Sequence, residues 1–289
     1  MRRRDFLRIT AAGSAFLGAP GWLAACGNRS GIGASDPLQV AEAAAAWIRA
    51  NGRESRGGLT WPAVPSESDA AALNLYSGTP GVILFLLELY DATGNPIYLK
   101  EAQEGAFLLQ GAFLESGGGP AAAGSNPEDP TIFDPGLYTG RAGAAFTLAE
   151  TFRGGGEMYR MGALSLLDGL MVTGKADSDG LAWYSDGPET ASYDIISGSA
   201  GIGLSLLYGY ETLEFHEALD GAVQAGRYLV KKGRPAEGGL KWPMTEAYPR
   251  LMPNFSHGTA GVAYFLGRLA EVTGDEEFLD AAIQGAKYL

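Results

Sequence analysis

A Gly-x-x-Gly element that returns about every 60 residues is the feature that most constrains the fold of this chain. Residues 78–109 align with residues 258–289 without a gap and share 14 identities in 32 positions, so the two segments are copies of one unit. Two intermediate copies follow the same pattern. The first glycines of the four elements are Gly78, Gly140, Gly198 and Gly258. A period of this length is typical of a helical hairpin with a substantial connection.

Each unit reads as two helices joined by a tight turn. The Gly-x-x-Gly element is followed by a run that is apolar nearly all round, such as VILFLLELY at residues 82–90, which favours a helix buried between layers. The run ends at Thr93-Gly94, where glycine can take the left-handed conformation that ends helices. Asn95 and Pro96 suit the cap and first position of the next helix, which is amphipathic and is expected on the outside.

Short extended pieces separate the hairpins. The sequences GLTW, GLAW and GLKW recur at residues 58–61, 180–183 and 239–242, whereas residues 111–135 are loop-like. Indole rings can stack a sugar or a peptide, but repetition of Trp61, Trp183 and Trp242 in three units indicates structural packing first.

Helical hairpins in series pack side by side as a curved double layer. The sequence therefore predicts an all-α fold, an α/α toroid (barrel) of helical hairpins with short β pieces between them. Four hairpins are present, and the sequence stops inside the second helix of the fourth. We therefore expect an incomplete ring and the N-terminal portion of a longer protein.

The first 26 residues are typical of an export signal. MRRRDFLRI places an arginine pair before Phe6, which indicates the twin-arginine route, and a modest apolar segment ends in LAAC at Cys26. This ending resembles a bacterial lipobox, so we expect Cys26 to carry a lipid that anchors the mature protein at a periplasmic or cell-surface membrane. The alternative is an unmodified cysteine in an ordinary signal segment. Residues 27–35 would form a linker and residues 36–289 the helical domain.

The net charge argues against nucleic-acid binding, and the cysteine content excludes a disulfide or a thiolate metal site within these residues. A net charge of −12, with no basic aromatic patch, gives no electrostatic footprint for nucleic acid. Cys26 is the only cysteine, so these residues form no intramolecular disulfide and no thiolate metal site.

The Gly-x-x-Gly helix starts, together with YDIISG at residues 193–198 and SHG at residues 256–258, resemble the lanthionine synthetase C-like family. The resemblance covers most of the chain after about residue 36. It implies a barrel of seven hairpins, of which this chain has the first four. It also implies a zinc ion that activates cysteine thiols of a precursor peptide for addition to dehydroalanine or dehydrobutyrine.

The sequence lacks the elements that bind zinc in the family. The family's zinc ligands lie in Trp-Cys and Cys-His-Gly elements of later repeats, and this sequence contains neither. Zinc is therefore implied by the resemblance alone, and no residue here is expected to bind it.

Two residues, Asp194 and His257, are the predicted catalytic site. The resemblance matches them to an acid and a histidine implicated in acid/base work. The residue before each first glycine is Ser77, Thr139, Ser197 and then His257. Serine and threonine suit helix capping there, whereas histidine is a poorer cap and asks for another reason.

The toroid explains how these two residues could meet. Inner helices of a toroid run parallel, so their N-terminal ends gather around one mouth and bring Asp194 towards His257. The positive end of the helix should keep His257 closer to neutral. A structural interpretation is also open: His257 bonds a neighbouring loop, and Asp194 caps the third inner helix. His216 is predicted to be a solvated surface residue.

The leading functional hypothesis is an exported, lipid-anchored member of this family that modifies peptides as a thioether cyclase when complete. The first alternative is an α/α-barrel glycoside hydrolase or lyase of the six-hairpin type, which would use acids among Asp134, Asp186 and Asp194. The second is a non-catalytic peptide-binding module. The residues do not identify the substrate, whether a peptide or a small molecule.

Overall fold

The computed structural model describes residues 36–55, 57–66, 72–115, 134–184, 190–236, 238–287 and 289. The predicted export signal with Cys26, and the predicted linker, lie outside the described residues. Within the described part, the regular secondary structure is helical apart from three pairs of short strands and isolated bridges, which confirms the predicted fold class. No helix in these ranges is long and apolar enough to cross a lipid bilayer.

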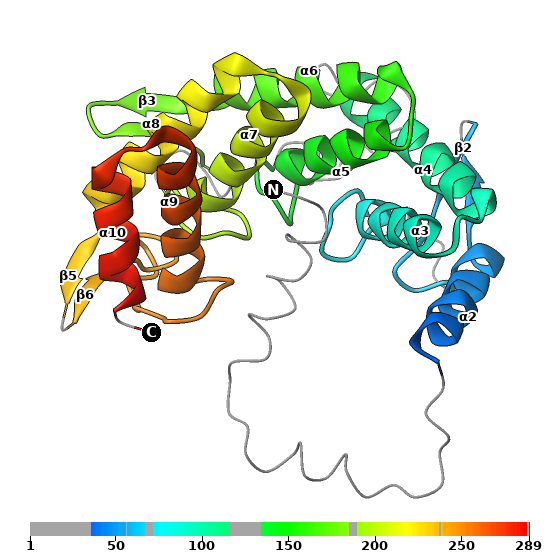
Figure 1. Cartoon of the computed structure of the whole chain (residues 1–289), viewed down its shortest axis with the longest axis horizontal. Helices are drawn as coiled ribbons and strands as arrows, with labels where there is room; N and C mark the ends of the chain where they lie inside the picture. The colour runs from blue at the N-terminus through cyan, green and yellow to red at the C-terminus, as the bar shows by residue number, and fades with distance from the viewer. Residues whose placement is uncertain are drawn as a thin grey trace, which may run out of the picture.

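Four helical hairpins follow one another along the chain. They are α3 (Thr79–Thr93) with α4 (Pro96–Glu115), α5 (Arg141–Arg153) with α6 (Glu157–Thr173), α7 (Ser199–Leu213) with α8 (His216–Lys232), and α9 (Thr259–Thr273) with α10 (Glu276–Ala286). The first helices of successive hairpins pack against one another, and so do the second helices. The result is a curved double layer, seen as an arc in Figure 1.

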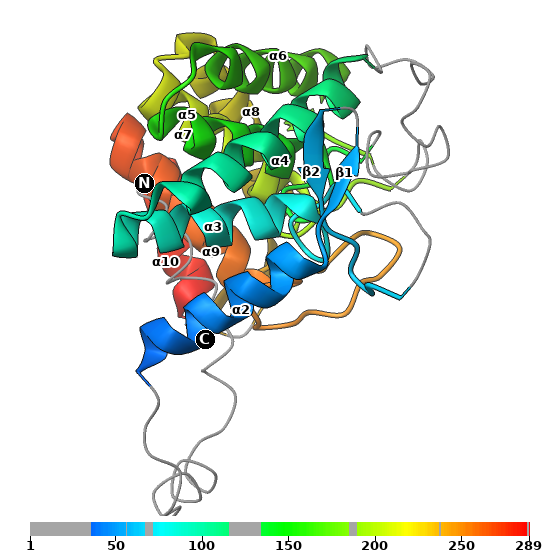
Figure 2. The ribbon, with the colours of Figure 1, turned by 90° about the vertical axis from the view of Figure 1, so that its right-hand side faces the viewer.

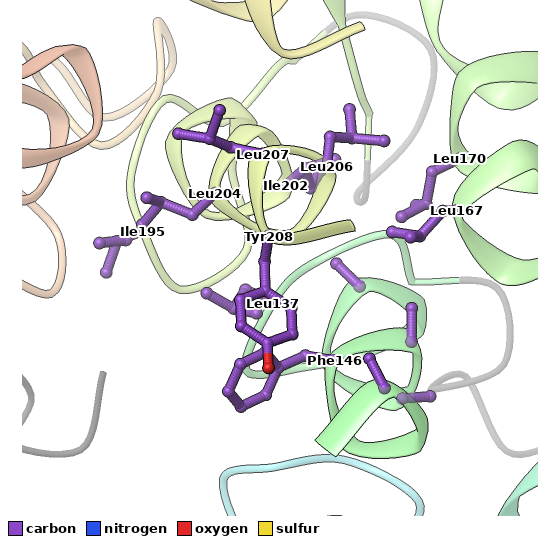
Figure 3. Packing of buried hydrophobic residues seen from close by; sticks show 14 of the residues in the cluster. Leu137, Phe146, Leu167, Leu170, Ile195, Ile202, Leu204, Leu206, Leu207 and Tyr208 are labelled. Atoms are coloured by element: carbon purple, nitrogen blue, oxygen red, sulfur yellow. The ribbon is translucent and has the colours of Figure 1, made fainter. Parts of the chain in front are cut away.

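The two layers differ in burial as the sequence predicts. Every residue of α7 from Ser199 to Gly209 is buried, whereas α8 buries one face through small and apolar residues and exposes the other. Between α5 and α7, the rings of Phe146 and Tyr208 meet edge to face with centroids 4.8 Å apart (Figure 3). The Tyr208 hydroxyl donates to the buried carboxylate of Glu150, which keeps that charge paired.

The predicted helix ends are confirmed at the first and fourth hairpins. Gly94 and Gly274 end α3 and α9 in the left-handed conformation, with φ of 69° and 70°. The Asn95 side chain accepts the Ile97 N–H at 3.2 Å at the start of α4, and Asp275 does the same for α10. These caps turn the chain back within two residues and so place each outer helix against its inner partner.

Each predicted extended piece is the second strand of a small antiparallel hairpin. The pairs are β1 (Arg53–Ser55) with β2 (Gly58–Thr60), β3 (Lys175–Asp177) with β4 (Gly180–Ala182), and β5 (Arg234–Ala236) with β6 (Gly239–Lys241). After β4 and β6, the buried indoles of Trp183 and Trp242 donate to the carbonyls of Leu170 and Leu229 at 2.8 and 2.7 Å. These two contacts confirm structural packing for both tryptophans.

One further helix, α2 (Pro37–Ala50), precedes the first hairpin and was not predicted from the repeat. It starts at Asp36, which accepts the Leu38 N–H, with proline at the first helical position. Arg49 pairs with Glu101 of α4, and its guanidinium lies over the ring of Tyr98. Because α2 runs directly into β1 and β2, as α8 runs into β5 and β6, it takes the place of an outer helix (Figure 2).

Candidate active site

The four loops that lead into the inner helices share one backbone design. The first helical N–H of each inner helix donates to the carbonyl six residues before the first motif glycine, at 2.8–2.9 Å: Thr79 to Ala72, Arg141 to Asp134, Ser199 to Ser192, and Thr259 to Met252. No side-chain cap bonds these starts. The predicted capping by Ser77, Thr139 and Ser197 is therefore wrong, because a backbone carbonyl already satisfies the leading N–H.

The first glycine of the motif permits this close return of the chain. A Cβ on Gly258 would lie 2.1 Å from the Met252 carbonyl oxygen, and one on Gly78 would lie 2.0 Å from that of Ala72. Only a residue without a side chain fits such a position. The first glycine of each motif thus lies in close contact with the backbone of the preceding loop. This contact explains why glycine is present at the start of every inner helix.

An Asn or Asp four residues before the glycine closes three of these loops. Its side-chain oxygen accepts the backbone N–H three residues later: Asn74 from Ser77 at 2.9 Å, Asp194 from Ser197 at 2.9 Å, and Asn254 from His257 at 2.7 Å. This contact is a local turn rather than a helix cap. The sequence pattern carried the signal, since residues 74, 194 and 254 are all of the Asx type.

The loops lie side by side at one end of the inner layer. Tyr76 donates its backbone N–H to the Tyr138 carbonyl at 3.1 Å, and Tyr138 donates to the Ile196 carbonyl at 2.9 Å. Residues from three different repeats are thereby joined edge to edge. These bonds show that the starts of the first three inner helices lie together at one mouth.

Asp194 is held rigidly at this mouth. Its Oδ1 accepts three backbone N–H groups, from Ile196 at 3.1 Å, Ser197 at 2.9 Å and Gly198 at 3.1 Å, and the residue is only 1% exposed. All three donors precede α7, so the suggested cap of the third inner helix is not what Asp194 provides. Because Oδ1 is fully engaged with the loop, Oδ2 is left to face the next repeat.

His257 meets that second oxygen. Its Nδ1 lies 2.7 Å from Asp194 Oδ2, while the side chain of His257 is 40% exposed and that of Asp194 is fully buried. A carboxylate only accepts hydrogen bonds, so Nδ1 carries the proton and Nε2 lies at the outer edge of the ring. Among the residues that the structure describes, Nε2 has no hydrogen-bond partner.

The Asp194 contact also changes the basicity of the imidazole. The hydrogen bond that His257 donates to Asp194 raises the pKa of His257 above its ordinary value, and partial burial opposes this only in part. The prediction that the helix start keeps His257 closer to neutral is therefore wrong. A hydrogen-bonded carboxylate in direct contact outweighs the partial charge of a helix end.

A second set of contacts, which the sequence did not reveal, clamps the Asp194 segment to the fourth repeat. Tyr193 donates its backbone N–H to the Met244 carbonyl at 2.9 Å and its hydroxyl to Glu246 at 2.6 Å. Glu246 also pairs with Arg234 of β5. Burial and the Glu246 bond raise the pKa of Tyr193, so its hydroxyl stays a donor. The loop before His257 thus fixes the residue next to Asp194.

Comparison with known proteins identifies the family of this chain. The sequence model of the family described as "Lanthionine synthetase C-like protein" matches residues 69–289, which is most of the chain. The chain belongs to the lanthionine synthetase C-like family. No curated protein matches the sequence of this LanC-like chain.

Solved structures share the fold of the LanC-like chain at low sequence identity. An α-1,6-mannanase of Salegentibacter sp. has a TM-score of 0.58 at 18% identity, over 87% of this chain and 69% of its own. A D-mannose isomerase has 0.57 at 14%, over 86% and 68%. A cellobiose 2-epimerase of Bacillus thermoamylovorans has 0.50 at 13%, over 74% and 59%. These similarities support an α/α toroid.

The donor set in the described part of the LanC-like chain does not fit zinc. Within residues 36–289, apart from the undescribed gaps, no three His, Cys, Asp or Glu side chains gather where they could hold a metal ion. The mouth offers one unbonded imidazole nitrogen, on His257, and Cys26 lies outside the described residues. A zinc site needs three or four such donors, so the described residues do not supply a complete one.

The other residues considered from the sequence fall into three groups. Asp134 closes its own loop by accepting the Gly136 N–H at 2.7 Å and the Thr139 hydroxyl at 2.9 Å. Asp186 lies outside the described residues. His216 is the exposed first residue of α8, which confirms its predicted surface position.

Proposed function

We propose that this LanC-like protein transfers protons at the mouth of the toroid, with His257 as the catalytic acid and base and Asp194 as its positioning residue. The carrying observation is the 2.7 Å contact between Nδ1 and Oδ2, together with the 40% exposure of the His257 side chain. The substrate class is a peptide with a cysteine thiol and a dehydrated residue. The product is a thioether ring, in keeping with the family.

The proton balance of that reaction suits a histidine of this kind. The thiol gives its proton to Nε2 of the neutral His257 ring, its sulfur forms a bond to the β-carbon of dehydroalanine or dehydrobutyrine, and the double-bond electrons move to an enolate. Protonated His257 then returns the Nε2 proton to the α-carbon, which restores the neutral ring. No proton is gained or lost overall, and the raised pKa of His257 favours the protonated ring that the second step uses.

Location is a separate part of the proposal. The arginine pair and the LAAC sequence support export through the twin-arginine route and lipid anchoring at Cys26, at the periplasmic or cell surface. The net charge of −12 supports a substrate other than nucleic acid.

The test is a thiol-protection assay on the whole protein. A peptide with one dehydroalanine and one cysteine is incubated with the protein, and free thiol is counted by iodoacetamide labelling and mass spectrometry, because cyclisation itself leaves the mass unchanged. We expect labelling to fall with the natural protein and to persist with His257→Asn. His216→Asn is the matched control and should behave as the natural protein. Equal loss of labelling with His257→Asn would overturn the role of His257.

A second candidate is proton transfer on a sugar. It is favoured by the three similar folds, which are described as a mannanase, a mannose isomerase and a cellobiose epimerase, and by Asp134 in the loop beside that of Asp194. Incubation with mannotriose, D-mannose and cellobiose, followed by chromatography, distinguishes it from the peptide reaction. Turnover of a sugar that depends on His257, without thiol protection, would replace the leading proposal. Binding of peptide without turnover would support the non-catalytic module.

A further inference from the structure

The loops that carry Asp194 and His257 are joined to each other differently from the other loops at the mouth. Between the first three loops, backbone N–H groups form a row, in which Tyr76 donates to Tyr138 at 3.1 Å and Tyr138 donates to Ile196 at 2.9 Å. The Ile196 N–H instead donates to Oδ1 of Asp194 at 3.1 Å, within its own loop. Among the described residues, no backbone hydrogen bond continues the row from Ile196 to the loop before α9. Other contacts therefore hold these two loops together.

Tyr193 joins the two loops through its backbone and through its side chain. Its N–H donates to the Met244 carbonyl at 2.9 Å, and its hydroxyl donates to Oε1 of Glu246 at 2.6 Å. Both acceptors belong to the segment between β6 and α9, which leads to His257. Because Tyr193 directly precedes Asp194, these two bonds set the separation of the loops at the candidate site.

The hydroxyl bond is the stronger of the two. Its length of 2.6 Å is typical of a hydroxyl that donates to a carboxylate, and such bonds are about twice as strong as neutral ones. Tyr193 is fully buried, and its ring lies against that of Tyr228 in α8 with centroids 5.9 Å apart. Tyr228 belongs to the same repeat as Tyr193, so this ring contact does not cross the junction. The bond to Glu246 does.

Glu246 is oriented by its second oxygen. Oε2 pairs with the guanidinium of Arg234 in β5, the strand that follows α8. The side chains of Arg234 and Glu246 are 35% and 57% exposed, so water screens the ion pair and its own contribution to stability is small. The pair leaves Oε1 for Tyr193. That hydrogen bond does not require a charged acceptor, because an amide oxygen can also accept a hydroxyl.

We propose that Glu246 is a positioning residue for the reaction at His257, and that it acts through Tyr193 on the contact between Asp194 and His257. Because Nδ1 and Oδ2 are 2.7 Å apart, a displacement of about 1 Å between the two loops would break their hydrogen bond. Glu246 itself bonds Tyr193 and Arg234 rather than the imidazole. The effect on turnover rests on the proposed function, whereas the effect on the contact can be measured without turnover.

The experiment measures the pKa of His257 by NMR titration of the whole protein and its variants, with His216 as the internal reference. Glu246→Ala removes both the acceptor and the charge. Tyr193→Phe removes the same hydrogen bond but leaves the charge of Glu246 in place. Glu246→Gln removes the charge but leaves an acceptor. The three variants thus separate positioning by the hydrogen bond from a direct effect of charge.

A matched control is available on α6. Glu157 also forms an ion pair with an arginine, Arg160, at 3.1 Å, and its side chain is 65% exposed. It lies at the start of an outer helix, at the end of the hairpin opposite the mouth. Glu157→Ala therefore removes a comparable charge and ion pair far from the site, and it should change neither the pKa of His257 nor the reaction.

We expect Glu246→Ala and Tyr193→Phe to lower the pKa of His257 towards its ordinary value, because both loosen the contact with Asp194. Glu246→Gln should restore most of the loss seen in Glu246→Ala. In the thiol-protection assay, the first two variants should slow the initial rate roughly tenfold or more through misplacement of the imidazole, and Glu246→Gln should again recover it.

An equal fall of the pKa in Glu246→Ala and Glu246→Gln, with no change in Tyr193→Phe, would show that Glu246 acts through its charge and would overturn the proposal. An unchanged pKa in Glu246→Ala would do the same. If Glu246→Ala does not fold, Tyr193→Phe and Glu246→Gln make the same comparison. Thiol protection that persists in His257→Asn would overturn the proposed function, and the pKa values would still decide whether Glu246 positions the contact.

Discussion

The Nδ1 atom of His257 lies 2.7 Å from Oδ2 of Asp194, although the two residues are 63 positions apart in the sequence. The contact crosses from the loop before α7 to the loop before α9, so it exists only when the third and fourth repeats pack correctly. Asp194 performs two tasks with its two oxygens, one closing its own loop and one holding the imidazole.

The two tasks of Asp194 predict different costs for two substitutions. Asp194→Ala leaves three backbone N–H groups without their acceptor and should lower the free energy of unfolding by on the order of 3 kcal/mol. Asp194→Asn retains a carbonyl oxygen that can replace Oδ1, so its cost should be about 1 kcal/mol. Urea unfolding measures both values. Similar costs for the two variants would mean that Oδ1 does not stabilise the loop.

The pKa of His257 should depend on the charge of Asp194. In an NMR titration we expect the natural protein to show a pKa above 6.5 and Asp194→Asn a lower one, with His216 as the internal reference. Since the folded pKa is raised, the stability from this group is complete below about pH 6.5 and is lost as the pH rises through the folded value. The stability gap between the natural protein and His257→Gln should therefore shrink over that window. A stability difference that widens as the pH rises would contradict a raised pKa of His257 in the folded protein.

Two glycines of α9 should respond to alanine in opposite directions. A Cβ on Gly261 would lie 2.2 Å from the Phe255 carbonyl oxygen, so Gly261→Ala should destabilise the protein by at least about 2 kcal/mol. At Gly267 the nearest atom would be Ala282 Cβ at 3.7 Å, so Gly267→Ala should stabilise by about 0.5–1 kcal/mol. Thermal and urea unfolding give both signs. If the two variants changed stability equally, helix propensity would decide the effect of alanine at Gly261, and the close approach to the Phe255 carbonyl would not.

The repeated tryptophans should not be equivalent in stability. Trp183→Phe removes a buried hydrogen bond to Leu170, whereas Trp61→Phe removes a donor that has no acceptor in the described chain. Both changes shrink the ring equally, so the difference isolates the N–H group. We expect Trp183→Phe to be more destabilising than Trp61→Phe by about 1 kcal/mol in urea unfolding. The opposite order would show that Trp61 is bonded within the protein.

Lipid anchoring is tested at Cys26. In the native host, Cys26→Ser should abolish incorporation of labelled palmitate and release the protein from the membrane fraction. The double substitution Arg3→Lys and Arg4→Lys should instead retain the protein inside the cell, because it changes the transport signal. Palmitate incorporation that persists in Cys26→Ser would rule out this cysteine as the anchor.

The residues of the candidate site could be predicted from the sequence, but their hydrogen bonds and the direction of the His257 pKa shift could not. The glycine spacing placed Asp194 and His257 at equivalent helix starts, and the parallel inner helices of a toroid then predicted their approach. The direction of the His257 pKa shift was missed, because the helix end was considered without the carboxylate in contact. The clamp between Tyr193 and Glu246 was missed as well, since it joins two loops whose sequences do not reveal the pairing.

The sequence by itself determined the hairpin, its period and its ends, because these depend on local rules. Glycine at a helix end, Asn or Asp at a turn and apolar residues at helical spacing act within a few residues of one another. Only the tertiary structure decided which oxygen of Asp194 faces His257, and that the Trp61 N–H lacks the acceptor available to Trp183 and Trp242. Those outcomes depend on contacts between segments whose relative placement shifts with a single residue of helix length, and such shifts leave the repeat pattern unchanged.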